Sequence, residues 1–479
     1  MKPAVSDFIE DFLGELLEGS AAIFAGAGLS VPAGFVDWRE LIRPLAKEVG
    51  LNIDLESDLV AVAQFHVNSN GANRSQLHKA VIEALSSDAL PTENHRLLAR
   101  LPISTWWTTN YDKLLENALR DAGKIVDVKS ALPQLATTRP RRDATIFKMH
   151  GDVDRPDQAV ATRDDFEKYT SERGAFITAL AGDLVSKTFL FLGFSFTDPN
   201  LDQVLTRVRL TFTTNQRRHY AVFKTRAQLP GESQRDFDHF RRRQELVIED
   251  LRRFNVRVLL IDEFSEITEF LTELVNRFQR RTVFISASVV DPTPWTYAGL
   301  QRFAQELGRS LIANGSRVAT GLGLGVGDAI FTGALREIMR SKMKIEDGLI
   351  LRPFPQSAEK EKGVWTDYRK ELISHAGISL FLFGNKMEGS EIVDASGMLE
   401  EFEISVSQGA VVLPIGGTGS VAANLASRVL SDPKKFPGLN DSAVEALKVL
   451  EKNPDDLDEL IEPIVKLVGE LQGGNQNGS

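Results

Sequence analysis

Four short segments of the sequence carry glycines or polar side chains directly after an apolar run. They are Gly26-Ala27-Gly28-Leu29-Ser30, Thr109-Asn110-Tyr111-Asp112, His150-Gly151, and the segment from Gly193 to Asn200, which contains Ser195 and Asp198. Glycine lets the backbone approach a ligand closely, and N–H groups at the start of a following helix can hold phosphate. Small polar groups suit a ribose, and histidine titrates near neutral pH. The set therefore suits a nucleotide that lies next to a general base.

The elements that must position these segments are parallel strands. Short apolar runs alternate with helical segments, which is typical of an α/β sheet. The runs span residues 21–25, 103–109, 145–148, 188–193, 220–223 and 256–261. Ligands of open α/β sheets bind outside the carboxyl ends of the strands. We therefore expect the four segments to converge on one crevice.

Each segment taken alone has a plainer interpretation. The GxGxxG fingerprint fails because Val31 stands where its last glycine would be, so Gly26 and Gly28 also fit a tight turn between strand and helix. A single histidine at a strand end is more often structural than catalytic. The other six histidines lack such neighbours and are interpreted as helix, loop or surface residues: His66, His78, His95, His219, His239 and His375.

Taken together and in this order, the four segments resemble the sirtuin family, over roughly residues 10–280. The resemblance implies an enzyme that cleaves NAD+ between nicotinamide and ribose. It implies that Asn110 orients the ribose or a water molecule and that His150 is the general base. The implied binding residues are Ala27, Gly28 and Ser30 for the phosphates, Asp112 for the nicotinamide amide, Ser195 for the adenosine ribose, and Asp198 as a further polar group of the ribose site.

The composition narrows the chemistry further. The chain has no cysteine, so the four-cysteine zinc module of protein-deacetylating sirtuins cannot form, and we expect no metal. Water then becomes the favoured acceptor in place of an acetylated peptide. The net charge of −10 argues against a protein that coats nucleic acid. No stretch of about 18 apolar residues and no basic N-terminal signal pattern are present, so we expect a cytoplasmic protein without a membrane segment.

The second half of the sequence repeats the architecture without an aligned internal repeat. Apolar runs recur at residues 282–286, 317–320, 348–351, 378–383 and 410–414. Two of them end in glycine turns, Gly321 to Gly327 and Gly416 to Gly419, and each turn leads into a helix, the first over residues 329–340. Such turns bind anions, so two of them suggest a nucleotide that bridges them. Two plain turns between strand and helix are the alternative.

This second half resembles the SLOG family of nucleotide-binding domains. The order of the two domains resembles the effector NADases of the Thoeris anti-phage system, in which a partner TIR-domain protein makes a cyclic ADP-ribose isomer that activates the effector. The resemblance implies an effector site in which Arg369 and Lys386 bind phosphate. It implies a ribose contact from Glu401, with Glu400 and Glu403 as alternatives. The full implied set is Gly323, Gly325, Arg369, Lys386, Glu401, Gly417 and Thr418. Surface charges are the alternative for Arg369 and Lys386.

The predicted fold class is α/β, with two Rossmann-like domains in series. We expect a sirtuin-type NAD-hydrolysing domain at residues 1–281, a SLOG nucleotide-sensing domain at 282–472, and a flexible Gly/Asn-rich tail at 473–479. An amphipathic helix at residues 6–19 could pack between subunits or cover its own sheet. The resemblance implies a homo-oligomer, a tetramer or a larger assembly.

The leading hypothesis is an NAD+ glycohydrolase that releases nicotinamide and ADP-ribose. A cyclic ADP-ribose isomer on the SLOG domain would switch it on, and depletion of NAD+ would serve abortive infection. An NAD-dependent deacylase or ADP-ribosyltransferase is the second hypothesis, and it would require a protein acceptor. A non-catalytic nucleotide sensor is the third, and it would release no nicotinamide.

Overall fold

The computed structural model describes residues 2–85, 89–196, 198–211, 216–352 and 362–473. The chain divides into two compact units, residues 1–275 and 276–479. The division falls within helix α11 (Ser265–Arg280). The last turn of this helix belongs to the second unit, within which Gly377 N donates to Gln279 O over 2.8 Å. The predicted boundary near residue 281 stays a prediction, and residues 474–479 of the predicted tail lie outside the described residues.

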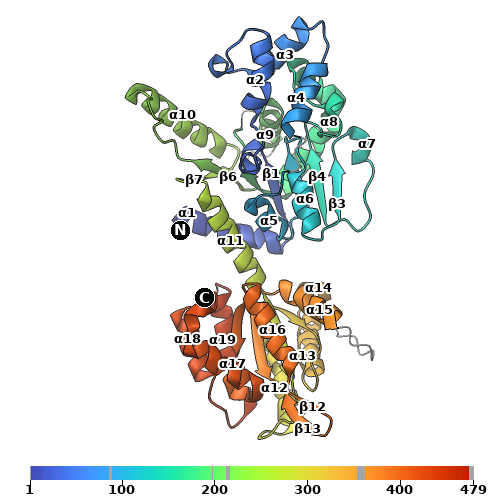
Figure 1. The fold of residues 1–479 in the computed structure, drawn as a ribbon, viewed down its shortest axis with the longest axis vertical. Helices are drawn as coiled ribbons and strands as arrows, with labels where there is room; N and C mark the ends of the chain where they lie inside the picture. The colour runs from blue at the N-terminus through green and yellow to red at the C-terminus, as the bar shows by residue number, and fades with distance from the viewer. Residues whose placement is uncertain (1, 86–88, 197, 212–215, 353–361, 474–479) are drawn as a thin grey trace. The chain divides into compact units, whose positions relative to one another are not determined.

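The first unit contains a seven-stranded parallel sheet with the order β3-β4-β2-β1-β5-β6-β7 (Figure 1). Its strands are β1 (Ala21–Ala25), β2 (Thr105–Thr108), β3 (Val126–Lys129), β4 (Ala144–Lys148), β5 (Thr188–Leu192), β6 (His219–Lys224) and β7 (Val256–Ile261). The chain builds outward from β1 on one side and then resumes at β5 on the other side. The carboxyl ends of β1 and β5 therefore form a topological switch point, where ligands bind in such sheets.

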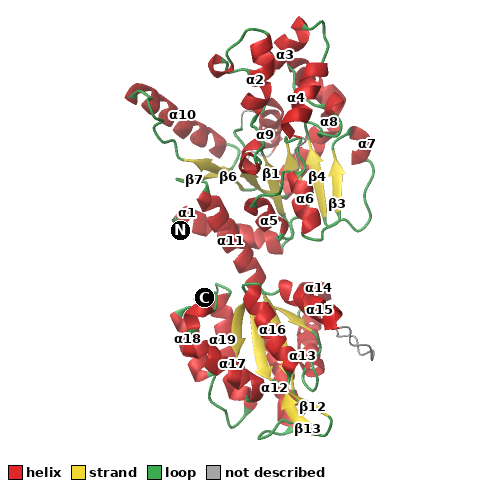
Figure 2. Cartoon of the chain, in the orientation of Figure 1, coloured by secondary structure: helices red, strands yellow, loops and turns green. Residues whose placement is uncertain are grey.

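Helices cover both faces of this sheet, and Figure 2 shows the helices and strands as separate layers. They are α1 (Pro3–Leu17), α2 (Trp38–Glu48), α3 (Leu59–Ser69), α4 (Ser75–Leu85), α5 (Glu93–Ala99), α6 (Leu114–Asp121), α7 (Leu132–Leu135), α8 (Arg163–Ser186), α9 (Pro199–Thr211), α10 (Gln234–Arg252) and α11. Helix α1 covers its own sheet, because the ring of Phe8 lies 4.9 Å from Tyr220 and 5.6 Å from Phe270. Helix α10 projects beyond the sheet edge at β7 (Figure 1).

The second unit has a five-stranded parallel sheet with the order β10-β9-β8-β11-β14, and a separate antiparallel pair β12-β13. Its strands are β8 (Thr282–Ser288), β9 (Arg317–Thr320), β10 (Leu349–Leu351), β11 (Ile378–Phe383), β12 (Asn385–Glu388), β13 (Glu391–Asp394) and β14 (Val411–Pro414). Its helices are α12 (Tyr297–Ala313), α13 (Gly327–Arg340), α14 (Ile345–Gly348), α15 (Lys362–Ser374), α16 (Ser396–Ser407), α17 (Ser420–Ser431), α18 (Asp441–Val449) and α19 (Ile461–Leu471). Two Rossmann-like parallel sheets in series are thus confirmed.

The sequence analysis missed strand β3 and the hairpin β12-β13. Strand β3 is only four residues long, and two of its residues are charged. Their charges neutralise each other inside the protein, since Lys129 Nζ lies 2.9 Å from Asp127 Oδ2 and both residues are buried. A search for apolar runs does not find this strand, because Asp127 and Lys129 interrupt its two valines, Val126 and Val128.

Two further features of the described chain bear on the expectations. Among the described helices, none is both long enough and apolar enough to cross a bilayer.

His219 was interpreted as a helix, loop or surface residue, and this is wrong, because it opens β6 and is buried. Its Nδ1 accepts a hydrogen bond from Phe189 N on β5 over 3.2 Å, which requires a neutral ring.

Burial, followed by repulsion from Arg217, lowers the pKa of His219 to about 3. The unfolded chain therefore binds a proton near pH 6.5 that the folded chain binds only near pH 3, so stability falls as the pH is lowered between these values. At pH 5 we expect His219 to reduce the free energy of unfolding by about 2 kcal/mol relative to pH 7.5. Urea unfolding of His219→Gln should lack this component, and the exposed His239→Gln is the control. If the free energy of unfolding depended on pH equally in the wild type, His219→Gln and His239→Gln, His219 would not be the source of the acid destabilisation.

Candidate functional site

Three glycines bring two backbones into contact at the first switch point. A Cβ on Gly26 would lie 2.3 Å from Gly193 O, and one on Gly28 would lie 2.9 Å from Gly193 Cα. Gly193 itself has φ +65°, and its Cβ would lie 2.2 Å from Leu29 N. Gly28 N donates to Gly193 O over 2.9 Å. The glycines after β1 therefore first serve to join the β1 loop to the β5 loop.

No α-helix starts directly after these glycines. Two 3-10 turns of three residues follow, Ala27–Leu29 and Val31–Ala33, and α2 begins only at Trp38. The expectation of a helix start next to the glycine loop is therefore wrong. The N–H groups of Gly28, Leu29 and Ser30 already donate within the protein, to Gly193 O, Gly26 O and Ala27 O. The predicted phosphate contacts of this loop therefore stay predictions.

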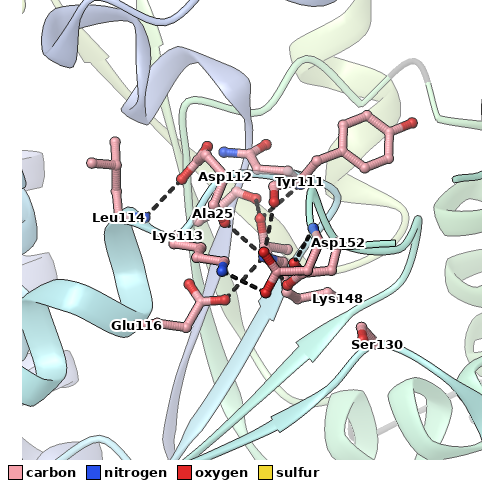
Figure 3. A network of polar contacts seen from close by, with 12 residues as sticks. Ala25, Tyr111, Asp112, Lys113, Leu114, Glu116, Ser130, Lys148 and Asp152 are labelled. Atoms are coloured by element: carbon pink, nitrogen blue, oxygen red, sulfur yellow. Dashed lines mark hydrogen bonds and ion pairs between the residues drawn. The ribbon is translucent and has the colours of Figure 1, made fainter. Parts of the chain in front are cut away.

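A chain of polar contacts connects the β1 loop to the β2 loop. Asn110 Nδ2 donates to Ser30 Oγ over 3.1 Å, and Ser30 Oγ donates to Asp112 Oδ2 over 2.8 Å. The other carboxylate oxygen of Asp112 accepts a hydrogen bond from Leu114 N over 2.9 Å, as Figure 3 shows, and Leu114 is the first residue of α6. Thr108 at the end of β2 donates to Ala25 O over 2.9 Å. Asn110, Ser30 and Asp112 are therefore held in one fixed group.

His150 follows β4 and faces the β5 loop. Its Nε2 lies 3.1 Å from Asp198 Oδ2, and both side chains are buried. The other oxygen of Asp198 accepts from Asn200 N at 2.9 Å and Leu201 N at 3.1 Å at the start of α9. Burial by itself would raise the pKa of Asp198, but the attraction and hydrogen bond of His150 and these two N–H groups outweigh it. The pKa of Asp198 therefore lies below its ordinary value.

The contacts of Asp198 add a second interpretation. The sequence analysis assigned it to a ribose, and its carboxylate also lies beside His150. A buried carboxylate beside an imidazole orients that ring. Because an ionised carboxylate can accept several hydrogen bonds, these contacts leave the ribose assignment as a prediction.

All eight residues predicted for the first site line one cavity of about 580 Å³. They are Ala27, Gly28, Ser30, Asn110, Asp112, His150, Ser195 and Asp198. The sequence analysis missed the apolar wall of this cavity, which comes from the helical segment before β2 and from α8. It consists of Phe35, Val36, Trp38, Leu41, Leu59, Val60, Leu85 and Phe166. Such residues carry the helical periodicity of any core, so no sequence signal separates them from packing residues. The cavity thus has both apolar side chains that suit a flat ring and polar groups in its lining.

Of the residues predicted for the second site, Arg369 and Glu401 contact each other, and Lys386 contacts the start of the same helix, α16. Arg369 on α15 lies 2.7 Å from Glu400 Oε2 and 3.3 Å from Glu401 Oε1, both on α16. Glu401 also accepts from Ser286 Oγ on β8 over 2.5 Å. Burial raises the pKa of Glu401 despite these two partners. Lys386 on β12 approaches the start of α16, with Nζ 3.3 Å from Ser396 Oγ. The charges lie on α15, α16 and β12, next to the carboxyl end of β8.

The glycines predicted for the second site have a packing role of their own. A Cβ on Gly323 would lie 1.8 Å from Ala287 O, and one on Gly325 would lie 2.1 Å from Val289 O. Gly417 is equally close to Lys452 O, at 2.3 Å. The hydroxyl of Thr418 is buried, accepts from Phe383 N and donates to Ile415 O. Close packing alone thus explains these four positions, and their predicted ligand contacts stay predictions.

Within the described residues, no three histidine, aspartate or glutamate side chains form a group that could hold a metal ion.

Two protein families match the sequence, one in each unit. The family of SIR2-like domains matches residues 104–246. The Sir2- and TIR-associating SLOG family matches residues 266–471. The order is the one that the two resemblances predicted.

Curated relatives match along nearly the whole chain. NAD(+) hydrolase ThsA of Bacillus cereus (strain MSX-D12) is 44% identical over 470 residues, which is 98% of this chain and 98% of the relative. NAD(+) hydrolase ThsA of Acinetobacter baumannii (strain 532279) is 44% identical over 469 residues, which is 93% of this chain and 97% of the relative. Defense-associated sirtuin 2 of Bacillus subtilis is 24% identical over 214 residues, which is 43% of this chain and 21% of that protein.

The contact between Gly193 and the β1 loop can be tested by Gly193→Ala. The substitution adds both a positive φ penalty and a backbone clash, so we expect a loss of about 2–4 kcal/mol in the free energy of unfolding. Gly231→Ala is the matched control, because Gly231 has φ +79° but no atom near the added Cβ, and should lose only about 1 kcal/mol. Similar losses in urea titrations would mean that the two loops do not need this contact.

Proposed function

The chain belongs to the ThsA family of NAD(+) hydrolases, and from this premise we propose that its first unit cleaves NAD+ to nicotinamide and ADP-ribose in the cavity at the β1/β5 switch point. The chain is accordingly an enzyme with NAD+ as substrate. One observation carries the assignment of the site. The fixed Ser30, Asn110 and Asp112 group and the His150–Asp198 pair line the same cavity.

The proposed reaction breaks the bond between the nicotinamide nitrogen and the ribose carbon. Nicotinamide is a cationic group in NAD+ and leaves as a neutral ring with the bonding electron pair. Water forms the new carbon–oxygen bond and gives its proton to His150, while Asp198 stabilises the imidazolium that results. Asn110 orients the ribose or the attacking water. Asp112 and the apolar wall hold the nicotinamide amide and ring.

The remaining binding residues follow from the family resemblance and the position of the cavity. Ala27, Gly28 and Ser30 would contact the phosphates from the β1 loop, and Ser195 would contact the adenosine ribose. The apolar wall beside Trp38 and Phe166 supports a flat nicotinamide ring at the other end. This arrangement leaves water as the acceptor, in place of a protein acceptor.

We further propose that the second unit binds a cyclic ADP-ribose isomer and activates the first. The name of its family, which associates SLOG domains with Sir2 and TIR domains, supports a partner TIR-domain protein as the source of this nucleotide. Arg369 would exchange Glu400 for an effector phosphate, since guanidinium binds both groups in the same way. Lys386 would bind a second phosphate and Glu401 a ribose hydroxyl. Depletion of NAD+ by a homo-oligomer, a tetramer or larger, would then serve abortive infection.

The catalytic assignment is tested by nicotinamide release from NAD+ with a cyclic ADP-ribose isomer present. We expect no detectable turnover in Asn110→Ala or His150→Ala. In Asp198→Asn we expect kcat to fall by about 100-fold, because the imidazolium loses its partner, with little change in KM. A raised KM with normal kcat in Asp198→Asn would indicate that Asp198 binds the ribose of the substrate and does not act on His150. Full activity of either alanine variant would refute the site.

The effector site is tested by Arg369→Ala. Removal of one charged phosphate contact should raise the isomer concentration for half-maximal activation by about 10-fold or more, without changing kcat at saturation. Lys370→Ala is the control, because Lys370 has the same charge on the same helix but is exposed. An unchanged dose response in Arg369→Ala would exclude this arginine from the effector site.

A further inference from the structure

Lys148 is the last residue of β4 and lies two positions before His150. Its side chain is completely buried, and one ammonium group reaches four oxygen atoms (Figure 3). Nζ donates to Tyr111 O over 3.0 Å and to Asp112 O over 2.6 Å. It also lies 2.9 Å from Glu116 Oε1 and 2.7 Å from Asp152 Oδ2. One cation therefore connects the loop after β2 with the loop after β4.

The charges of this cluster require the ammonium form. Burial lowers the pKa of Lys148, but the attraction of Glu116 and Asp152 outweighs it, so the pKa lies above its ordinary value. Both carboxylates are themselves almost inaccessible. Loss of the cation would leave two buried carboxylates without a counter-charge, which proteins rarely tolerate.

The backbone contacts set this lysine apart from a simple buried ion pair. Asn110 precedes Tyr111 directly, and Asp112 is the residue whose side chain fixes Ser30. Val153 N, in the loop after β4, donates to the same Tyr111 O over 3.0 Å, so the loops after β2 and β4 are in contact at this carbonyl. Tyr169 supports the other side of the β4 loop through a hydrogen bond to Met149 O over 3.0 Å. Lys148 thus holds the segment that carries Asn110 against the segment that carries His150.

We propose that Lys148 is a positioning residue of the reaction, which sets the separation of Asn110 and His150 by holding the carbonyls of Tyr111 and Asp112. This inference rests on the proposed function. Lys148 is not among the residues that line the cavity. It reaches Ser30 on the loop after β1 indirectly, through Asp112, so we expect its loss to reduce turnover more than substrate binding.

If Lys148 served only stability, its loss would affect turnover only through folding. Variants that remove the charges of Lys148, Glu116 and Asp152 together distinguish this structural role from the positioning role. In Lys148→Met the two buried carboxylates lose their counter-charge, and the pKa of Glu116, which burial already raises, loses the attraction that lowers it, so the protein should lose stability. In the triple variant Lys148→Met, Glu116→Gln, Asp152→Asn no charge remains, and the thermal midpoint should recover towards the wild-type value. A structural lysine predicts that turnover recovers with stability. A positioning lysine predicts that turnover stays low, because the carbonyl of Asp112 has lost its ammonium donor and that of Tyr111 keeps the bond from Val153 N but not the one from Lys148.

The matched control is the other buried lysine pair of this sheet. Lys129 and Asp127 on β3 form an ion pair of 2.9 Å, and the ammonium of Lys129 donates to Thr137 O, which is not part of the cavity lining. The double variant Lys129→Met, Asp127→Asn removes a buried pair in the same sheet without touching the loops of Asn110 and His150. It should keep kcat and KM within about threefold of the wild type.

The experiment measures nicotinamide release by the full chain with a cyclic ADP-ribose isomer. Circular dichroism gives the folded fraction by which kcat is scaled, and calorimetry measures NAD+ binding separately. In the triple variant we expect kcat to fall by about 100-fold, with KM within about threefold of the wild type. A kcat within about threefold of the wild type, or a parallel loss of NAD+ binding, would overturn the positioning role. No release by the wild-type chain would overturn the proposed function itself, and this role with it.

Discussion

Gly193 packs its backbone directly onto Gly26 and Gly28, and the first site depends on this contact. The order of the sheet places β1 and β5 side by side with their carboxyl ends adjacent. A Cβ at any of the three glycines would push the loops apart, because each would lie under 3 Å from backbone atoms of the other loop. Ser30 lies on the β1 loop and Asp198 on the β5 loop, and both line the cavity. The glycine contacts therefore set the distance between the two loops that carry these residues.

Two polar groups then complete the cavity from the neighbouring strands. The Asn110, Ser30 and Asp112 group connects β2 to β1, and the His150–Asp198 pair connects β4 to β5. Each of the two side chains predicted to be catalytic, Asn110 and His150, thus contacts a partner from another strand end. Rigid placement of this kind is what a reaction with a good leaving group requires from an enzyme, since most of its contribution is orientation and electrostatics.

The second unit uses the same backbone contact for its glycine loop. Gly323 and Gly325 after β9 pack onto the carbonyls of Ala287 and Val289 at the end of β8. The charged groups differ, because Arg369 is neutralised by Glu400 and Glu401 within the unit. The effector phosphate that we propose for this site would compete with these carboxylates. Its binding and the release of an internal ion pair would then be one event, which is how a ligand can shift an equilibrium between two arrangements.

The sequence by itself determined the class of fold, the order of the two domains and the identity of the polar residues at the first site. These properties depend on local patterns: apolar runs that stop at glycine, and polar residues directly after them. It did not determine the partner of Asp198, the apolar wall with Phe35 and Phe166, or the four contacts of Lys148. It also missed β3, in which two of the three buried residues are charged. Each of these depends on a contact between residues far apart in the chain, such as Lys148 with Tyr111 or His150 with Asp198. The packing of strands and loops creates such contacts, and no local pattern encodes the partner, so only the tertiary structure could decide them.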